Sequence, residues 1–280
     1  MLTCYLQGGL GNQLFQIFTT ISYGLTYKKP FVFTKQTQLD TKRSTYWHSF
    51  LSPLAKFTKD INYSYNNNPF KITEKAFTYN ELPPSDAPFI LLNGYFQSSK
   101  YFARHTAVIM RLIQLDEQKA LVKLNPLVKD INFQKTISLH FRQGDYKQIQ
   151  SHHPLMPYVY YQKGLKHMLN TFTPTPYNNI LIFCEESDLS SITPILNQLK
   201  TAFPSLTFQV MSPTLSDWEQ LLAMSLCAHN IIANSSYSWW GAYFNTNPNK
   251  IVCYPANWFG PKLQQNDIKD LCPPSWTRIV

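Results

Sequence analysis

Short apolar runs alternate with longer amphipathic stretches along most of the chain. The first apolar run covers residues 2–7 and leads directly into a glycine-rich turn, after which apolar residues recur at helical spacing. A second apolar run begins at Pro30. Residues 2–34 therefore predict a strand, a tight turn, a helix and a second strand, which together form a β-α-β unit.

The pattern weakens between residues 36 and 88, where Asn, Tyr, Ser, Pro and Lys are frequent. This composition predicts loops and short helices. Regular structure returns with a strand predicted over residues 89–97, which contains a glycine near its exit. A helical stretch is predicted from residue 98 to about 124, and a connector follows it.

The second half of the chain repeats the alternation of strand and helix. Capping signals mark two helix starts: Thr193 stands before a proline, and Ser216 forms a capping box with Glu219. Strands are predicted in the apolar runs 136–142, 179–186, 206–210, 230–234 and 250–254. Alternating strands and helices predict parallel sheets with covered faces. We therefore predict an α/β fold of two Rossmann-like domains, residues 1–133 and 134–280, that face each other across a cleft.

Composition and charge narrow the class of protein. The chain has 280 residues, of which 44% are apolar and 15% charged, as expected of a globular protein. Its 25 Lys and Arg exceed its 16 Asp and Glu, giving a net charge of +9 that attracts anions. The basic residues form no patterned stripe of the kind that binds nucleic acid. Most of these basic residues are expected to be solvated. A smaller anion, such as a nucleotide diphosphate, fits the others as a binding partner.

The five cysteines lack metal-binding or paired spacing, and they are expected to be reduced core residues. The N-terminal residues show no basic leader, and no later segment approaches the roughly 18 apolar residues of a membrane span. We therefore expect a cytoplasmic, soluble protein.

The glycine-rich turn GGLGNQLFQ is the first candidate binding motif. Gly9 and Gly11 leave backbone N–H groups at a helix start accessible to an anion. Asn12 and Gln13 add amides that can reach a ligand. The motif lacks the third glycine of a dinucleotide-binding turn and the Lys of a phosphate-binding loop. A tight turn that only requires small residues explains the pattern equally well.

The segment HFRQGDY is the second candidate motif. A period of two puts His140 and Arg142 on one face of the strand, opposite its apolar side chains. Arg142 is then expected at the carboxyl end of a parallel strand, where ligands bind, and its guanidinium suits two phosphate oxygens. The alternative is a structural ion pair with Asp145, with His140 in the core. Asp145 itself fits a base, an anchor or a turn residue.

The third motif, NSSYSWWGAY, lies where a predicted strand becomes a helix. Asn234, Ser235 and Ser236 present hydroxyls and N–H groups at that helix start. Adjacent tryptophans cannot both face the same core. One is therefore expected to pack, and the other, assigned as Trp239, to wall a pocket.

Two adjacent acids, Glu185 and Glu186, end another predicted strand, at the same carboxyl edge of the sheet as Arg142. Adjacent acids most often form a solvated edge, and contact with a ribose or sugar is the alternative. The sequence has no DxD pair, HExxH motif or Gly-x-Ser-x-Gly elbow. We therefore expect no metal and no cofactor, and assign the electrostatic role to arginine.

Taken together, GGLGNQLFQ, LNGYFQSSKYF, HFRQGDY, FCEESD and CAHNIIANSSYSWWGAYFN resemble the α-1,2-fucosyltransferase family in order and spacing. The chain departs from it at Gln143, where the family commonly shows a second Arg, and at residues 184–186, where Ser-Asp-Asp is common. The resemblance implies a GT-B fold, GDP-β-L-fucose as donor, and inverting transfer to the 2-hydroxyl of a terminal galactose in a glycan. It implies no obligatory metal. Residues 1–133 then form the acceptor-side domain and residues 134–280 the GDP-fucose domain.

The resemblance also implies roles for the candidate residues. Arg142, with the turn at residues 9–12, stabilises charge on the departing diphosphate, and His140 supports Arg142 or touches the nucleotide. The three polar residues of the third motif hold phosphate or guanosine. Asp145 is the first choice for the base that relieves the acceptor of its proton. Glu185 and Glu186 are alternatives, as is a water relay.

Two other functions stay open. The same Arg-bearing strand occurs in α-1,6- and protein O-fucosyltransferases, so the linkage is less firmly indicated than the donor. A lectin-like or nucleic-acid-binding module would use the basic surface without catalysis.

Overall fold

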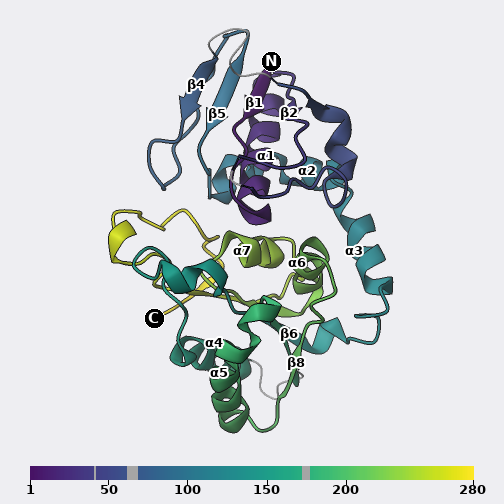
Figure 1. Cartoon of the computed structure of the whole chain (residues 1–280), viewed down its shortest axis with the longest axis vertical. Coiled ribbons are helices and arrows are strands. Elements are labelled where there is room, and N and C mark those ends of the chain that lie inside the picture. Colours follow the sequence, from purple (N-terminus) through teal and green to yellow (C-terminus); the bar gives the residue numbers. More distant parts are fainter. Residues whose placement is uncertain (41, 62–68, 172–176) are drawn as a thin grey trace. The chain divides into compact units, whose positions relative to one another are not determined.

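The computed structural model describes residues 1–40, 42–61, 69–171 and 177–280 (Figure 1). The chain divides into two compact units: Met1–Gln118 with Asn266–Pro273, and Lys119–Gln265 with Pro274–Val280. The predicted boundary lay after residue 133, whereas this division falls inside helix α3 (Leu115–Leu124). Lys119, on α3, donates a hydrogen bond to the carbonyl of Phe244 at 2.9 Å, which ties the later part of α3 to the second unit.

The segment Asn266–Pro273 belongs to the first unit through Asp270. The Asp270 carboxylate pairs with Lys100 at 2.5 Å and accepts from the backbone N–H of Tyr79, while its carbonyl accepts from the hydroxyl of Ser98. Burial alone would raise the pKa of Asp270, but the contacts with Lys100 and with the N–H of Tyr79 outweigh it and lower that pKa. Sequence patterning gives no sign of this return, because it depends on side chains far apart in the chain.

The first unit contains a three-stranded parallel sheet in the order β1-β5-β4. A second, two-stranded sheet pairs β2 with β3 in parallel. The elements are β1 (Leu2–Cys4), α1 (Leu10–Thr26), β2 (Phe33–Thr34), β3 (Thr58–Lys59), β4 (Phe70–Thr73), β5 (Ile90–Asn93) and α2 (Thr106–Leu112). The 3₁₀ helices are Ser52–Phe57, Ser99–Tyr101 and Ala103–His105.

The predicted strand, turn, helix and strand over residues 2–34 are present as β1, α1 and β2. Apolar side chains of α1 pack in the core because they recur at helical spacing; Phe15, Phe18 and Ile21 are fully buried. The second strand differs from the prediction, since β2 pairs with β3, and only a single bridge joins Leu2 to Phe31.

Two predicted segments of the first unit are more structured, or more broken, than their patterns suggest. The stretch 36–88 contains β3 and β4 among its loops, and residues 41 and 62–68 of it lie outside the described residues. The helical stretch 98–124 is interrupted at Gln114, whose φ of 52° separates α2 from α3. A residue in the left-handed conformation ends a helix even where the apolar residues keep their helical spacing. The spacing alone therefore predicted one continuous helix where the structure has two.

The second unit contains a six-stranded sheet in the order β11-β10-β9-β6-β7-β8, with every neighbouring pair parallel. The strands are β6 (Thr136–His140), β7 (Asn179–Phe183), β8 (Thr207–Val210), β9 (His229–Ile231), β10 (Val252–Pro255) and β11 (Thr277–Ile279). The helices are α4 (Tyr158–Thr171), α5 (Leu189–Ala202), α6 (Asp217–Leu226) and α7 (Ser236–Tyr243). The 3₁₀ helices are Phe133–Lys135, Gly144–Gln148, Glu186–Asp188 and Pro261–Leu263. The predicted parallel strands are confirmed in this unit.

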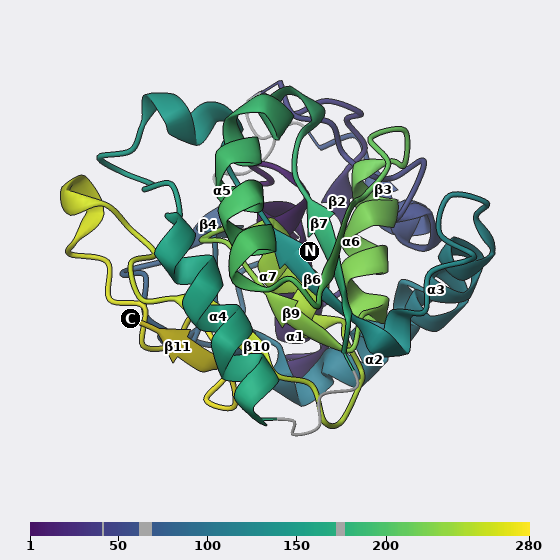
Figure 2. The same cartoon turned by 90° about the horizontal axis from the view of Figure 1, so that it is seen from below.

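The two faces of this sheet are chemically different. On one face Ile137, Leu139 and Ile231 pack in a core with side chains of α4 and α5, and both views show these helices side by side (Figures 1 and 2). On the other face Asn230 donates to the hydroxyl of Ser138 at 2.7 Å and to a carbonyl of α6. The period of two predicted for β6 therefore separates an apolar from a polar side.

Helix starts in the second unit confirm one capping prediction and correct another. Ser216 and Glu219 form the predicted capping box at α6. Thr193 does not begin a helix: α5 starts at Leu189, and Pro194 lies inside it. The hydroxyl of Thr193 instead donates to the Leu189 carbonyl, as mid-helix threonines do.

Among the described residues, none of the helices has the length and apolar character needed to cross a membrane.

Candidate functional site

The strand order of the second unit changes direction between β6 and β9, although all its strands run parallel. From β6 the sheet continues through β7 and β8 on one side, and through β9, β10 and β11 on the other. In open α/β sheets, the carboxyl ends of the strands flanking such a switch point form the ligand-binding crevice. The loops that leave β6 and β9 are therefore the candidate site.

Arg142 lies just after the end of β6 and forms ion pairs with two carboxylates. One terminal nitrogen lies 2.5 Å from Oε1 of Glu185, and the other lies 2.5 Å from Oδ1 of Asp145. The Arg142 side chain is 23% exposed, while those of Asp145 and Glu185 are 51% and 53% exposed. The ion pair of Arg142 with Asp145, which the sequence offered as the structural alternative to ligand binding, is thus present, and a contact with Glu185 accompanies it.

An aromatic column supports the same guanidinium. Arg142 lies over the ring of Tyr146 at 5.0 Å from its centroid, and Tyr146 stacks on His153 at 4.7 Å. The Tyr146 hydroxyl donates to the carbonyl of Asn234 at 3.2 Å, which links the loop after β6 to the loop after β9. Burial raises the pKa of Tyr146 to about 12, so the phenol is protonated at neutral pH.

A buried carboxylate fixes the turn that follows Arg142. Asp188 is 1% exposed; it accepts from the backbone N–H of Gly144 at 2.8 Å and pairs with Lys147 at 2.7 Å. The 3₁₀ helix Gly144–Gln148 is therefore anchored to the segment after β7. The sequence analysis missed Asp188 and Tyr146, whose only signal is that they lie close to strand exits.

His140 lies at the end of β6 and is 6% exposed. Burial, and then the nearby charge of Arg142, lower its pKa from 6.5 to about 3. The imidazole is therefore neutral at physiological pH and provides a hydrogen-bonding group but no charge. Its ring lies 5.5 Å from that of Tyr237 on α7, and among the described residues its Nδ1 has no hydrogen-bond partner.

The polar residues after β9 are brought to the same edge. Asn234 is 1% exposed, and its amide donates to the carbonyls of Pro154 and Trp258. Ser235 caps α7 by accepting from the backbone N–H of Tyr237. These side chains hold the loop in place, and α7 begins there with the positive end of its dipole.

Both adjacent tryptophans differ from the expectation that one walls a pocket. Trp239 and Trp240 are each fully buried. Trp239 stacks on Tyr243 at 4.7 Å and contacts Trp276, while Trp240 packs on Phe244. Adjacent residues of a helix point about 100° apart. Buried aromatic side chains lie in both directions, so each tryptophan finds a place in the core.

The glycine-rich turn in the first unit forms the start of α1, as predicted. A side chain added at Gly9 would meet nothing within 4 Å, so the backbone is open there. Gly8 has a φ of 78°, and a Cβ there would lie 2.4 Å from the Asn12 amide. The turn therefore requires Gly8 for its conformation and leaves Gly9 accessible.

The other candidates of this turn are used for internal contacts. Gly11 and Gln13 are buried, and the Gln13 amide donates to the carbonyls of Gly8 and Ser44 at 3.0 and 2.9 Å. Asn12 accepts from Gln97 at 2.8 Å. Gln13 therefore does not reach outward as expected, because its side chain lies on the core face of α1.

Residues 1–279 match the sequence model of Glycosyl transferase family 11. The chain belongs to this family of glycosyltransferases. Membership confirms the resemblance to α-1,2-fucosyltransferases that the motifs indicated.

Two sequence relatives and one solved structure are similar to this glycosyltransferase. It is 27% identical to the O-antigen biosynthesis glycosyltransferase WbnK of Escherichia coli, with all of both chains covered. It is 26% identical to an α-1,2-colitosyltransferase of Escherichia coli, over 66% of this chain and 61% of that protein. Its fold is similar to that of a mutant of Arabidopsis thaliana FUT1 in complex with GDP, with a TM-score of 0.51, 10% identity, and coverage of 99% of this chain and 75% of that one. The predicted GT-B fold is confirmed.

Gln143 directly follows Arg142 in this glycosyltransferase. Its side chain is buried and accepts from the hydroxyl of Ser191 in α5 at 2.5 Å. The side chain of Gln143 is therefore bonded to α5 and does not take part in the ion pairs of Arg142.

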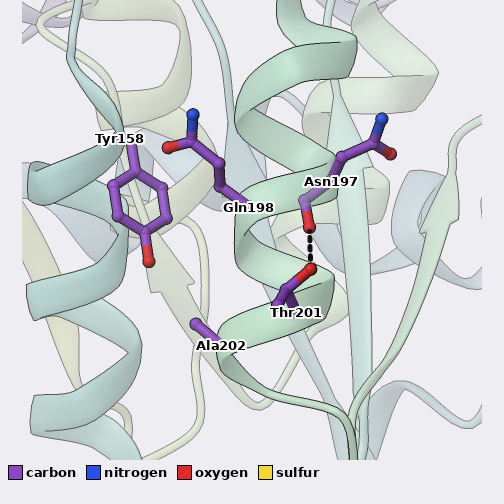
Figure 3. A pocket seen from close by; sticks show the side chains of 5 residues that line it. All are labelled: Tyr158, Asn197, Gln198, Thr201 and Ala202. Atoms are coloured by element: carbon purple, nitrogen blue, oxygen red, sulfur yellow. Dashed lines mark hydrogen bonds between the residues drawn. The ribbon is translucent and has the colours of Figure 1, made fainter.

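A separate hollow of about 430 Å³ lies between α4 and α5 of this glycosyltransferase (Figure 3). Tyr158 lines it from α4, and Asn197, Gln198, Thr201 and Ala202 line it from α5. None of the predicted site residues and no charged side chain is among these. The chemistry is thus concentrated at the carboxyl edge of the sheet.

Proposed function

We propose that this glycosyltransferase transfers L-fucose from GDP-β-L-fucose, with inversion and without a metal, to the 2-hydroxyl of a terminal galactose. The observation that carries the proposal is Arg142 at the switch point, held by half-exposed carboxylates that an anion can replace. Family membership supports glycosyl transfer. The GDP bound by the similarly folded FUT1 supports a guanosine diphosphate donor. The galactose acceptor and the cytoplasmic location rest on the sequence alone.

In the proposed reaction, a bond forms between the acceptor oxygen and the anomeric carbon of fucose while the bond from that carbon to the phosphate oxygen breaks. The electron pair of the broken bond passes to the departing GDP. Arg142 stabilises the charge that grows on the diphosphate, a contribution of roughly 3–4 kcal/mol when the donor group is fixed and water is excluded. Because His140 is neutral, it can orient the nucleotide or Arg142 by a hydrogen bond.

The proton of the acceptor hydroxyl needs a base, and Asp145 is our first candidate. Its carboxylate is half-exposed and directly follows the Gly144 turn. Ser235 and Ser236, with the first N–H groups of α7, are proposed to bind phosphate or guanosine. The accessible backbone at Gly9 in the first unit is a further proposed contact for the diphosphate.

A binding experiment tests the donor. GDP is expected to raise the melting temperature, ADP and NAD are not, and Arg142→Ala is expected to abolish the GDP shift. Stabilisation by NAD alone would exclude the proposed donor. Fucose transfer is expected to continue in the presence of a chelator, and a strict requirement for metal would overturn the proposed mechanism.

Transfer of another sugar, colitose, is a second candidate because one relative is an α-1,2-colitosyltransferase. A competition between GDP-linked fucose and colitose as donors separates the two, with the ratio of their kcat/KM values as the readout. We expect fucose to be preferred.

A further inference from the structure

Arg142 has both of its terminal nitrogens occupied by carboxylates. We propose that Glu185 is a displaceable placeholder for the donor: it holds Arg142 when the site is empty, and the diphosphate takes its place. This inference rests on the proposed function, because it assumes that Arg142 binds a diphosphate. It gives Glu185 a positioning role in place of the sugar contact that the sequence suggested.

The charges make displacement necessary. Arg142 supplies one positive charge, and two carboxylates lie 2.5 Å from it. A diphosphate that approached this group would bring further negative charge against both carboxylates, and like charges at contact distance repel strongly. At least one carboxylate therefore has to leave Arg142 when the donor binds.

Glu185 is the carboxylate that is free to move. Asp145 lies in the same short 3₁₀ helix that Asp188 anchors through Gly144 and Lys147, so its backbone is fixed close to Arg142. Glu185 reaches Arg142 from the end of β7 with a longer side chain that is 53% exposed. It can rotate into solvent without disturbing the turn.

The backbone leaves room for this contact. A Cβ at Gly144 would lie 2.9 Å from Oε1 and 3.0 Å from Oε2 of Glu185, and the φ of Gly144 is 39°. The turn thus combines a conformation that favours glycine with a gap that the Glu185 carboxylate fills. Arg142 also lies 5.0 Å from the centroid of the Tyr146 ring, a contact that does not involve Glu185.

Calorimetric titration with GDP tests the placeholder in the full-length chain. Glu185→Asp keeps the charge but shortens the reach by one methylene, and Glu185→Gln removes the charge. Both are expected to bind GDP about two- to five-fold more tightly than the wild type, the size expected from a partly exposed ion pair. Glu186→Gln is the matched control: it removes the same charge one position away, on an exposed residue, and should tighten GDP binding less than Glu185→Asp does.

Each result decides between alternatives. Weaker GDP binding by both Glu185 variants would overturn the placeholder, because it would make Glu185 a donor contact or a structural support. Equal tightening by Glu185→Gln and Glu186→Gln, with none by Glu185→Asp, would also overturn it and leave only a general charge effect. If the wild type itself does not bind GDP, the proposed function fails. Wild-type binding that Arg142→Ala removes, with no gain in the Glu185 variants, refutes the placeholder alone.

Discussion

Two turns in this glycosyltransferase leave a strand and carry polar residues, yet they use them differently. In the turn at the start of α1, Gln13 bonds two backbone carbonyls and is fully buried. In the turn after β6, Arg142 is bound by carboxylates that are more than half exposed. Gln13 helps to build the fold, because its buried side chain is committed to two carbonyls of the same unit. A charge held by solvent-exposed partners can exchange them for a ligand.

The largest effect is expected when the positive charge of Arg142 is removed. Arg142→Ala should lower kcat/KM for GDP-fucose by about 10²–10³-fold, because a positioned donor of positive charge is lost from the transition state. Steady-state kinetics checks this. Arg278→Ala, which removes the same charge from an exposed residue of β11, is the control and should retain most of the activity. Equal losses in both variants would mean that Arg142 acts only through the overall charge.

Asp145 shows whether a partner of Arg142 also takes part in the reaction. If Asp145 is the base, Asp145→Asn should lower kcat by about 10²-fold and remove the acidic limb of the pH-rate profile. If it only braces Arg142, the acidic limb should persist while KM for the donor rises. The pH-rate profile of this variant is the deciding measurement.

The α1 turn should respond in stability and not in binding. Gln13→Ala removes both hydrogen bonds of this buried side chain and should lower the free energy of unfolding by roughly 2 kcal/mol. Chemical denaturation measures this, with Gln36→Ala on an exposed residue as the control. The melting shift on adding GDP should persist in Gln13→Ala. Loss of that shift, with a folded protein, would show that the turn binds the donor through Gln13.

The smallest effect concerns pH. His140 has its pKa lowered to about 3 in the fold, whereas the unfolded chain protonates near 6.5. Protons therefore favour the unfolded state as the pH falls below 6.5, and at pH 5.5 this costs about 1.3 kcal/mol relative to pH 7. His140→Gln should reduce that loss in denaturation curves at pH 7 and 5.5. His48→Gln, on an exposed histidine, should leave it unchanged.

The sequence predicted the second unit more closely than the first. Five of the six strands of the larger sheet coincide with predicted apolar runs, and β6 and β9, whose residues are all buried, leave a clear signal. β11 was not predicted, because only its last residue is buried. In the first unit, β3 and β4 lie in a segment without periodicity, and β4 has only one buried residue. The return of residues 266–273 to the first unit depends on Asp270, whose partners are more than a hundred positions away.

The candidate site was predicted in part. Strand exits located Arg142, Asp145 and Glu185, since the carboxyl ends of parallel strands meet at one edge. Residue type alone could not show that Trp239 is buried or that Asp188 anchors the turn. Both depend on the direction in which the side chain points from its helix or loop, and the packing of the whole unit determines that direction.

The most direct test of the proposed function is the linkage of the product. The protein is incubated with GDP-fucose and a panel of oligosaccharides, some ending in galactose, and NMR identifies the bond that forms. We predict fucose attached in α linkage to the 2-hydroxyl of terminal galactose. Attachment at a 6-hydroxyl or to a protein hydroxyl, or a panel left unmodified while nucleic acid binds tightly, would contradict the account.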